Sequence, residues 1–312
     1  EIAQKTKCPV TSIQSTHCDG QWRLPTEVVT QNYHPYNSGY GKASHSGYHL
    51  FDIVSQFYKN SVVPGKEGDE VEVMSSFVQP RGLLLQMDHQ DYSNYFGEEY
   101  ENVCKYSDKE LWKKFEKYGE VDVSTIARIK KNKTNVCNIS INLLHNGFSR
   151  RDWIRPGNDL YKGNGRVKHE YHNIQQGPFQ NIQIHSYQSK DKHDTNTKDD
   201  LLIGGNNHFD IYVFRNVDIL KESKPFEVIS ISDLNSCTTD ETNKIKLISE
   251  ISKATVVEEF VQFVLGQLPK TRLVSNIEDH LLPVQLMSST YLSHNYQLKN
   301  WSPIVKNKLI HQ

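Results

Sequence analysis

Residues 168–187 read KHEYHNIQQGPFQNIQIHSY, and this stretch is the starting point for the interpretation of the fold. A Gly-Pro pair within QQGPFQ separates two segments in which isoleucine or valine alternates with polar residues. Such alternation on both sides of a turn is typical of two strands that pair as a hairpin. The sequence therefore predicts strands over residues 167–174 and 181–188.

One face of this predicted hairpin carries groups suited to acid–base chemistry. If Ile174 pairs with Asn181, Glu170 lies opposite His185, within hydrogen-bonding range. The same register gives two further pairs, Lys168 with Tyr187 and His172 with Gln183. A carboxylate, imidazoles and an amine are the groups that metal-independent RNA cleavage requires: a base for the 2′-OH, an acid for the leaving oxygen and a cation for the phosphate.

The preceding loop extends this hypothesis. Residues 146–166 are rich in glycine and arginine, so that arginines would bind phosphates while aromatic rings stack on unpaired bases. The predicted catalytic residues are Glu170 (base), His185 (acid), His172, Lys168 and His280. His280, in IEDHLLP, fits either a catalytic group or a half-buried structural histidine. The predicted substrate-binding residues are Arg150, Arg151, Arg155, Arg166, Tyr187 and Trp153.

The composition limits the functional class. The chain has 312 residues, 36% of them hydrophobic, with a net charge of −1, so the whole molecule is not a polycation for nucleic acid. Charge is nevertheless uneven: residues 61–104 hold nine acidic and two basic residues, and residues 105–168 hold seven acidic and fifteen basic. This asymmetry indicates a basic surface for an anionic partner. No apolar run of about 18 residues occurs, so no membrane span is expected.

Cysteines and sequons favour a secreted protein. Cys8 and Cys18 lie in a turn-rich segment and are expected to form a disulfide loop, and an odd cysteine would stay free or join a partner chain. Sequons occur at Asn132, Asn138 and Asn300, and the sequence starts without Met. We therefore expect a processed, secreted chain that acts in the cytoplasm of a target cell.

The order of the predicted elements indicates an α+β fold, with antiparallel sheets and a few packed helices in a single domain, 1–312, subdivided near 1–104 and 105–312. Residues 1–44 are expected to be irregular and residues 88–104 to be a loop. Ser107 and Glu110 form a capping box ahead of a short helix. The other predicted helices are 45–59 and 243–268, the latter the longest, and the other strands are a hairpin of 70–78 with 82–87, then 136–144, 209–214 and 226–231.

Two other functional classes remain open. A metal-dependent nuclease or hydrolase would use His45, His49 and Asp52, spaced i, i+4 and i+7 on one helix. Asp210 and Glu227 on successive strands are similar to the PD-(D/E)xK nucleases, although Ile229 stands where that motif has lysine. The third class is a non-enzymatic binding or immunity protein, whose many Tyr and His residues would serve recognition.

In general character the chain resembles the secreted killer-toxin ribonucleases of yeasts. The resemblance rests on the Asn/Lys/Ile/Ser-rich composition, the sequons, the odd cysteine and the His, Glu and Arg groups without a metal motif. It implies cleavage of tRNA anticodon loops without a cofactor, giving a 2′,3′-cyclic phosphate, together with a disulfide-linked carrier subunit and an immunity protein. The family's early Glu and late His have Glu1 or Glu27, and His280 or His294, as counterparts here.

Overall fold

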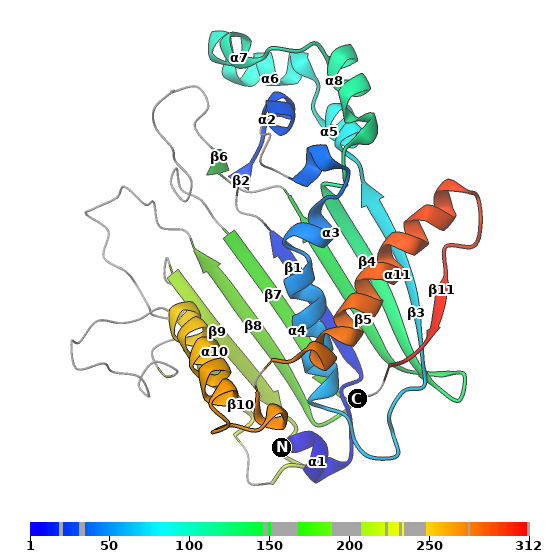
Figure 1. The fold of residues 1–312 in the computed structure, drawn as a ribbon, viewed down its shortest axis with the longest axis vertical. Helices are drawn as coiled ribbons and strands as arrows, with labels where there is room; N and C mark the ends of the chain where they lie inside the picture. The colour runs from blue at the N-terminus through cyan, green and yellow to red at the C-terminus, as the bar shows by residue number, and fades with distance from the viewer. Residues whose placement is uncertain are drawn as a thin grey trace, which may run out of the picture.

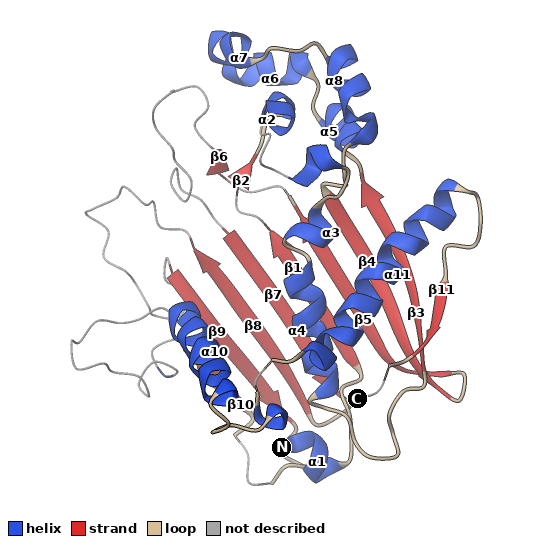
Figure 2. Ribbon diagram, in the orientation of Figure 1, coloured by secondary structure: helices blue, strands red, loops and turns tan. Residues whose placement is uncertain are grey.

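The computed structural model contains one large mixed sheet with helices over one of its faces (Figures 1 and 2). It describes residues 1–18, 21–30, 35–145, 149–150, 168–188, 207–221, 224–230, 233, 248–273 and 275–310. In this part of the chain no helix is long and apolar enough to cross a membrane.

The large sheet has nine strands in the order β10-β9-β8-β7-β1-β5-β4-β3-β11. Their bounds are β1 Ser12–Cys18, β3 Glu70–Val78, β4 Asp122–Lys131, β5 Thr134–Leu144, β7 Lys168–Gln176, β8 Gln180–Gln188, β9 Asn207–Arg215, β10 Phe226–Ile229 and β11 Val305–Lys308. Strands β1 and β5 pair in parallel, and the other neighbours in this sheet pair antiparallel. A separate parallel pair joins β2 Gln21–Trp22 to β6 Ser149–Arg150.

Helices α4 and α11 cross the face of the sheet that is turned toward the viewer in Figure 1. A group of short helices, α2 and α5 to α8, lies beyond one end of the sheet. The α-helices are α1 Ile2–Thr6, α2 Pro25–Thr30, α3 Lys42–His45, α4 Tyr48–Lys59, α5 Pro80–Gln86, α6 His89–Phe96, α7 Glu98–Val103, α8 Asp108–Lys114, α10 Ile248–Val264 and α11 Leu281–Leu298. The 3-10 helices are η1 Pro35–Ser38, η2 Phe115–Lys117, η3 Lys270–Arg272 and η4 Ile277–His280.

The main core lies between the sheet and these two helices. The predicted inward positions of β5 are confirmed: Cys137, Ile139, Ile141 and Leu143 are all buried. From α4, Phe51 and Val54 pack on them with no exposed surface. Because side chains alternate along a strand, the other face of the same strands presents polar residues, such as Ser140 beside Ile126 of β4.

The α+β class is confirmed, as a mixed and mostly antiparallel sheet with packed helices. The helix predicted over 45–59 is present as α3 and α4, with a break at Ser46 and Gly47. The capping box of Ser107 and Glu110 is confirmed at the start of α8. The predicted helix 243–268 corresponds to α10, although at 17 residues it is shorter than the 18-residue α11.

Several local predictions are wrong. In place of the predicted strand 82–87, residues 82–86 belong to α5, which starts at Pro80, because proline suits the first turn of a helix as well as a hairpin turn. Residues 88–104 form α6 and α7, since Asp88 and Asp91 make a capping box. The 1–44 segment contains the central strand β1.

The expected disulfide between Cys8 and Cys18 is absent. Residues 12–18 between them form an extended strand. At about 3.3 Å per residue, the strand alone holds its two ends roughly 20 Å apart. A disulfide requires Cα atoms within about 7 Å, so the strand separates the two thiols.

Replacing isoleucine by alanine should lower the free energy of unfolding by different amounts on the two faces of the sheet. Ile141→Ala removes a side chain with no exposed surface and leaves a cavity, so the free energy of unfolding should fall by about 2–5 kcal/mol. Ile126→Ala is the matched control: Ile126 is 50% exposed on the opposite face of β4, and we expect a loss below about 1 kcal/mol. Urea unfolding measures both. Equal losses would contradict the assignment of faces.

Candidate functional site

The hairpin of β7 and β8 has a register one residue away from the predicted one. Ile174 pairs with Ile182 rather than Asn181, which places Glu170 opposite Ser186. A shift of one residue moves a side chain to the other face of a sheet. His185 consequently lies on the face without α4, where its ring packs 4.8 Å from that of Tyr171. The predicted base and acid are therefore on opposite faces.

Glu170 has a different imidazole partner, His17 of β1. Glu170 and His17 are Cα partners across the antiparallel β1–β7 pair, and Oε1 of Glu170 lies 2.9 Å from Nδ1 of His17. The histidine is 5% exposed, whereas the glutamate side chain keeps 23% of its surface exposed. This arrangement orients the ring and directs the Nδ1 proton toward the carboxylate.

A second buried pair continues this ladder one step along the strands. Nδ1 of His172 lies 2.9 Å from the hydroxyl oxygen of Ser15, its Cα partner on β1. The ring of His172 also packs edge-on against Phe57 of α4, with centroids 5.5 Å apart. Burial, more than the neighbouring charges, holds the pKa of His172 below its usual value, so this histidine is a neutral positioning group.

A further histidine–carboxylate pair occurs at the end of β5. His145 follows directly after this strand and is 2% exposed. Its Nδ1 and its backbone N–H both lie 2.7 Å from Oδ1 of Asp122, the first residue of β4. Its Nε2 is buried without a hydrogen-bond partner among the described residues.

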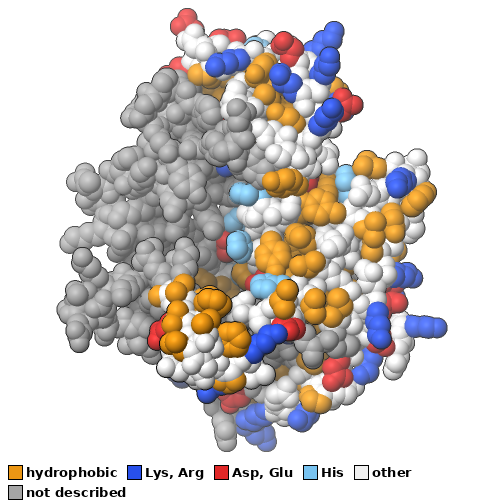
Figure 3. Space-filling view, viewed as in Figure 1, with side chains coloured by type: hydrophobic (Ala, Val, Ile, Leu, Met, Phe, Trp, Pro, Cys, Tyr) orange, Lys and Arg blue, Asp and Glu red, His pale blue; other side chains and the backbone are white. Residues whose placement is uncertain are grey.

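These pairs share one end of the sheet. Because β1 and β5 run parallel, with Cys18 opposite Leu144, His17 and His145 lie at the carboxyl ends of neighbouring strands. The carboxyl ends of parallel strands are a common location of ligand sites in α/β sheets. Figure 3 shows several histidine side chains at the surface of the helix-covered face, whereas His17, His172 and His145 are almost fully buried. We refer to His17, Glu170, Ser15, His172, His145 and Asp122 as the β1–β5 end group.

The three residues proposed as metal ligands lie near this end but on two helices. His45 ends α3, whereas His49 and Asp52 belong to α4, and both histidines are exposed. Among the described residues, no group of three or more His, Cys, Asp or Glu side chains has metal-binding geometry. Here Asp52 has instead a buried Oδ1 without a hydrogen-bond partner within the described chain.

His280 occupies a structural position at the start of α11. Its Nδ1 hydrogen-bonds the hydroxyl of Tyr48 in the first turn of α4, and its Nε2 lies 3.1 Å from the hydroxyl of Ser275. The next residue toward the N-terminus, Asp279, pairs with Lys59 at the far end of α4. These contacts fasten α4 to α11, which matches the structural alternative for His280.

The remaining predicted site residues do not join this group. Asp210 is fully buried on the face without α4, whereas Glu227 lies on the α4 face in an ion pair with Arg215, so the two carboxylates do not form a nuclease site. Arg151, Trp153, Arg155 and Arg166 lie outside the described residues. Arg150, Lys168 and Tyr187 are placed on β6, β7 and β8, with undescribed side chains.

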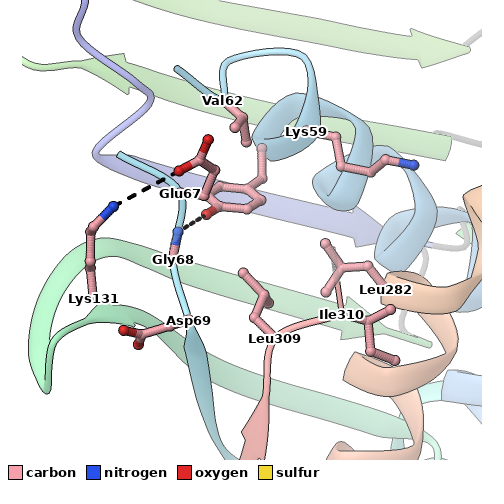
Figure 4. A pocket seen from close by; sticks show the side chains of 10 residues that line it. Lys59, Val62, Glu67, Gly68, Asp69, Lys131, Leu282, Leu309 and Ile310 are labelled. Carbon is pink, nitrogen blue, oxygen red and sulfur yellow. Dashed lines mark hydrogen bonds and ion pairs between the residues drawn. The ribbon is translucent and has the colours of Figure 1, made fainter. Parts of the chain in front are cut away.

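A cavity of about 510 Å³ lies at the opposite end of α4 (Figure 4). Its carboxylates are occupied: Glu67 pairs with Lys131 at 3.8 Å, and Asp69 accepts the backbone N–H of Asn132 at 2.8 Å. The hydroxyl of Tyr58 accepts the N–H of Gly68. The lining contains no histidine or cysteine, so the β1–β5 end group is the stronger candidate for acid–base chemistry.

Sequence reasoning missed four members of this group: Ser15, His17, Asp122 and His145. The alternating pattern of SIQSTHC, residues 12–18, was the available signal for a strand, but its inward positions are Ile, Ser and His rather than a uniformly apolar set. His145 directly follows the strand that was predicted. Its pairing with Asp122 is not encoded locally, because it depends on the pairing of β4 with β5.

The comparisons with known proteins identify no family: no family model matches the chain, and no curated protein is similar to it in sequence. Among solved structures, an oxidoreductase from Sinorhizobium meliloti has a TM-score of 0.46 and 8% identity, covering 95% of this chain and 57% of that one. GenD2 from gentamicin A biosynthesis, in complex with NAD, has a TM-score of 0.41 and 8% identity. The match covers 99% of this chain and 59% of GenD2. The chain thus spans less than two thirds of either structure.

The prediction of a toxin-like endoribonuclease is wrong. The structure places Glu170 and His185, the base and the acid on which the mechanism depended, on opposite faces of the sheet.

The buried His172 predicts an acid-dependent loss of stability. Because burial lowers its pKa below the unfolded value of 6.5, the unfolded state binds more protons between these two values. The free energy of unfolding should therefore fall as the pH drops through this window. His172→Asn should flatten the fall, as measured by urea unfolding from about pH 5 to about pH 8. His49→Asn, at an exposed position of α4, is the control, and a wild-type slope in His172→Asn would refute this role.

Proposed function

We propose that the chain is part of an enzyme that binds a small hydroxylated molecule at the carboxyl ends of β1 and β5, where His17 transfers a proton. The observation that carries this proposal is the 2.9 Å contact between Nδ1 of His17 and Oε1 of Glu170. An imidazole with a carboxylate behind it is the arrangement in which a histidine acts as a general base. A protein that only needed a stable sheet could fill both positions with apolar residues.

The His17–Glu170 pair gives each ring nitrogen of His17 a separate role in this proposal. When Nδ1 carries the proton and donates it to the Glu170 carboxylate, Nε2 of His17 holds the lone pair that accepts a proton from the substrate. The carboxylate then stabilises the imidazolium that forms. Removal of a proton from a hydroxyl group is the step that alcohol oxidation requires as hydride departs. This places His17 as the base and Glu170 as its positioning residue.

The neighbouring groups favour a neutral substrate with several hydroxyl groups. Imidazole, hydroxyl and carboxylate groups dominate the β1–β5 end group, and each can donate or accept a hydrogen bond. The described side chains of this group include no lysine or arginine, whereas recognition of a phosphate usually relies on such cations. The buried Nε2 of His145, which lacks a partner in the described part of the chain, is a further group that a hydroxyl could satisfy.

Ligand binding tests this proposal through the histidine side chains. Protein with ¹⁵N-labelled histidine is titrated with neutral polyols and sugars, with inorganic phosphate and with NAD, the ligand named for GenD2. We expect saturable shifts of the His17 and His145 resonances with a hydroxylated compound. His17→Gln should weaken this binding by about tenfold or more, the equivalent of about 1.4 kcal/mol.

The matched controls separate the site from the fold. His294 lies on α11, stacked on Phe77 at 4.3 Å, and takes part in none of the pairs of the β1–β5 end group, so its resonance should not move and His294→Gln should bind normally. Glu170→Gln keeps the shape of the positioning residue but removes its charge, and should shift the pH dependence of the His17 resonance. Titrations in which no ligand moves His17, or in which His294 moves equally, would contradict the proposal.

A further inference from the structure

The group of short helices contains a cysteine in contact with a histidine. Cys104 follows α7 and is free and partly buried. Its Sγ lies 3.6 Å from Nδ1 of His89, the first residue of α6. This is a hydrogen-bonding distance for sulfur, and a thiol in contact with an imidazole can transfer its proton to the ring.

The other ring nitrogen of His89 has a carboxylate partner. Nε2 lies 3.2 Å from Oε1 of Glu101 in α7, and the ring packs 5.2 Å from that of Tyr100. Glu101 also accepts a hydrogen bond from the hydroxyl of Ser93. Thiol, imidazole and carboxylate thus follow one another in contact, the order in which a nucleophile, its base and the group that orients the base occur in thiol enzymes.

A cavity gives this thiol room for a reaction partner. Its volume is about 460 Å³, within the range of small-molecule sites, and it is lined by His89, Cys104, Lys105, Tyr106, Ser107 and Asp108. The pocket therefore exposes sulfur and imidazole to the same space.

Several polar groups surround the thiol of Cys104. Sγ lies 3.2 Å from the carbonyl oxygen of Tyr106, which competes with His89 for the thiol proton. The buried Tyr100 has a raised pKa, first through burial and then through its hydrogen bond with Cys104, so its hydroxyl remains a proton donor toward sulfur. Lys105 and Asp108 bring opposite charges to the pocket wall.

Cys8 and Cys137 have different surroundings. Sγ of Cys8 hydrogen-bonds the carbonyl of Pro9 at 3.5 Å, and Cys137 lies in the core, where burial raises the pKa of its thiol to about 12. A thiol of this second kind stays protonated and unreactive at neutral pH. Contact with an imidazole–carboxylate pair sets Cys104 apart from both.

We propose that Cys104, His89 and Glu101 form a nucleophilic thiol site that undergoes exchange with small disulfides, independently of the β1–β5 end group. His89 takes the proton from Cys104, and the thiolate attacks one sulfur of a disulfide RS–SR. A new S–S bond forms between Cys104 and R, the old S–S bond breaks, and the departing RS⁻ takes the proton back from His89. Cys104 is oxidised to the mixed disulfide, and one of the two sulfurs of RS–SR is reduced to a thiol.

Site-resolved kinetics with oxidised glutathione as the probe test this inference. After timed exposure at neutral pH, peptide mass spectrometry measures the modified fraction of each cysteine. We expect Cys104 to react at least about tenfold faster than Cys8, because His89 is placed to take the thiol proton of Cys104 as the sulfur attacks. His89→Gln should slow Cys104 by about tenfold and leave the rate of Cys8 unchanged.

Two glutamates of α7 provide the matched comparison. Glu101→Gln should lower the Cys104 rate and shift its pH profile, whereas Glu99→Gln, exposed on the same helix, should behave as wild type. Both positions are exposed, so neither change threatens the fold, and urea unfolding verifies this. The inference is overturned if Cys104 reacts no faster than Cys8, or if Glu101→Gln and His89→Gln both keep the wild-type rate.

Discussion

The parallel pairing of β1 with β5 is the interaction on which the rest of the structure depends. Strands β3, β4 and β5 form one antiparallel meander, and β7 to β10 form another. Among the described strands, only β1 pairs with both, with β5 on one side and with β7 on the other. The seven residues of β1 therefore join the two meanders into one nine-stranded sheet. The main core contains side chains from β1 and from its neighbours β5 and β7.

This position imposes a constraint on the side chains of β1. Its inward residues run from Ile13 through Ser15 to His17, all at 5% exposure or less. A buried polar group without a partner costs about 1–3 kcal/mol. The antiparallel register with β7 supplies partners in sequence, His172 for Ser15 and Glu170 for His17. The pairing of β1 with β7 that joins the two halves of the sheet therefore also supplies the hydrogen-bond partners within the β1–β5 end group.

The helices that cover this face are held against the sheet and against one another by specific contacts. Gly47, at the break between α3 and α4, approaches β5 so closely that a Cβ atom would lie 2.4 Å from Cδ1 of Leu143. The buried Glu120 accepts hydrogen bonds from the backbone of Ala43 and the hydroxyl of Tyr291, tying α3 to α11. Burial raises the pKa of Glu120 in spite of these bonds. The helical layer is thus anchored by both close packing and buried polar contacts.

Taken alone, the sequence determined the elements whose patterns are local. Alternation predicted β5 and the two strands of the 168–187 hairpin, and the spacing of apolar residues predicted α4, because each pattern reports which face of an element is buried. It did not determine the register of that hairpin: the predicted register was wrong by one position, a shift that exchanges the faces of one strand relative to the other. Tertiary structure decided the pairing of β7 with β1, which brings Glu170 to His17, while the β7–β8 register places His185 on the other face. It likewise brought Cys104 to His89 and Glu101, because the distances between side chains depend on how helices pack, and the sequence specifies that packing only through the whole fold.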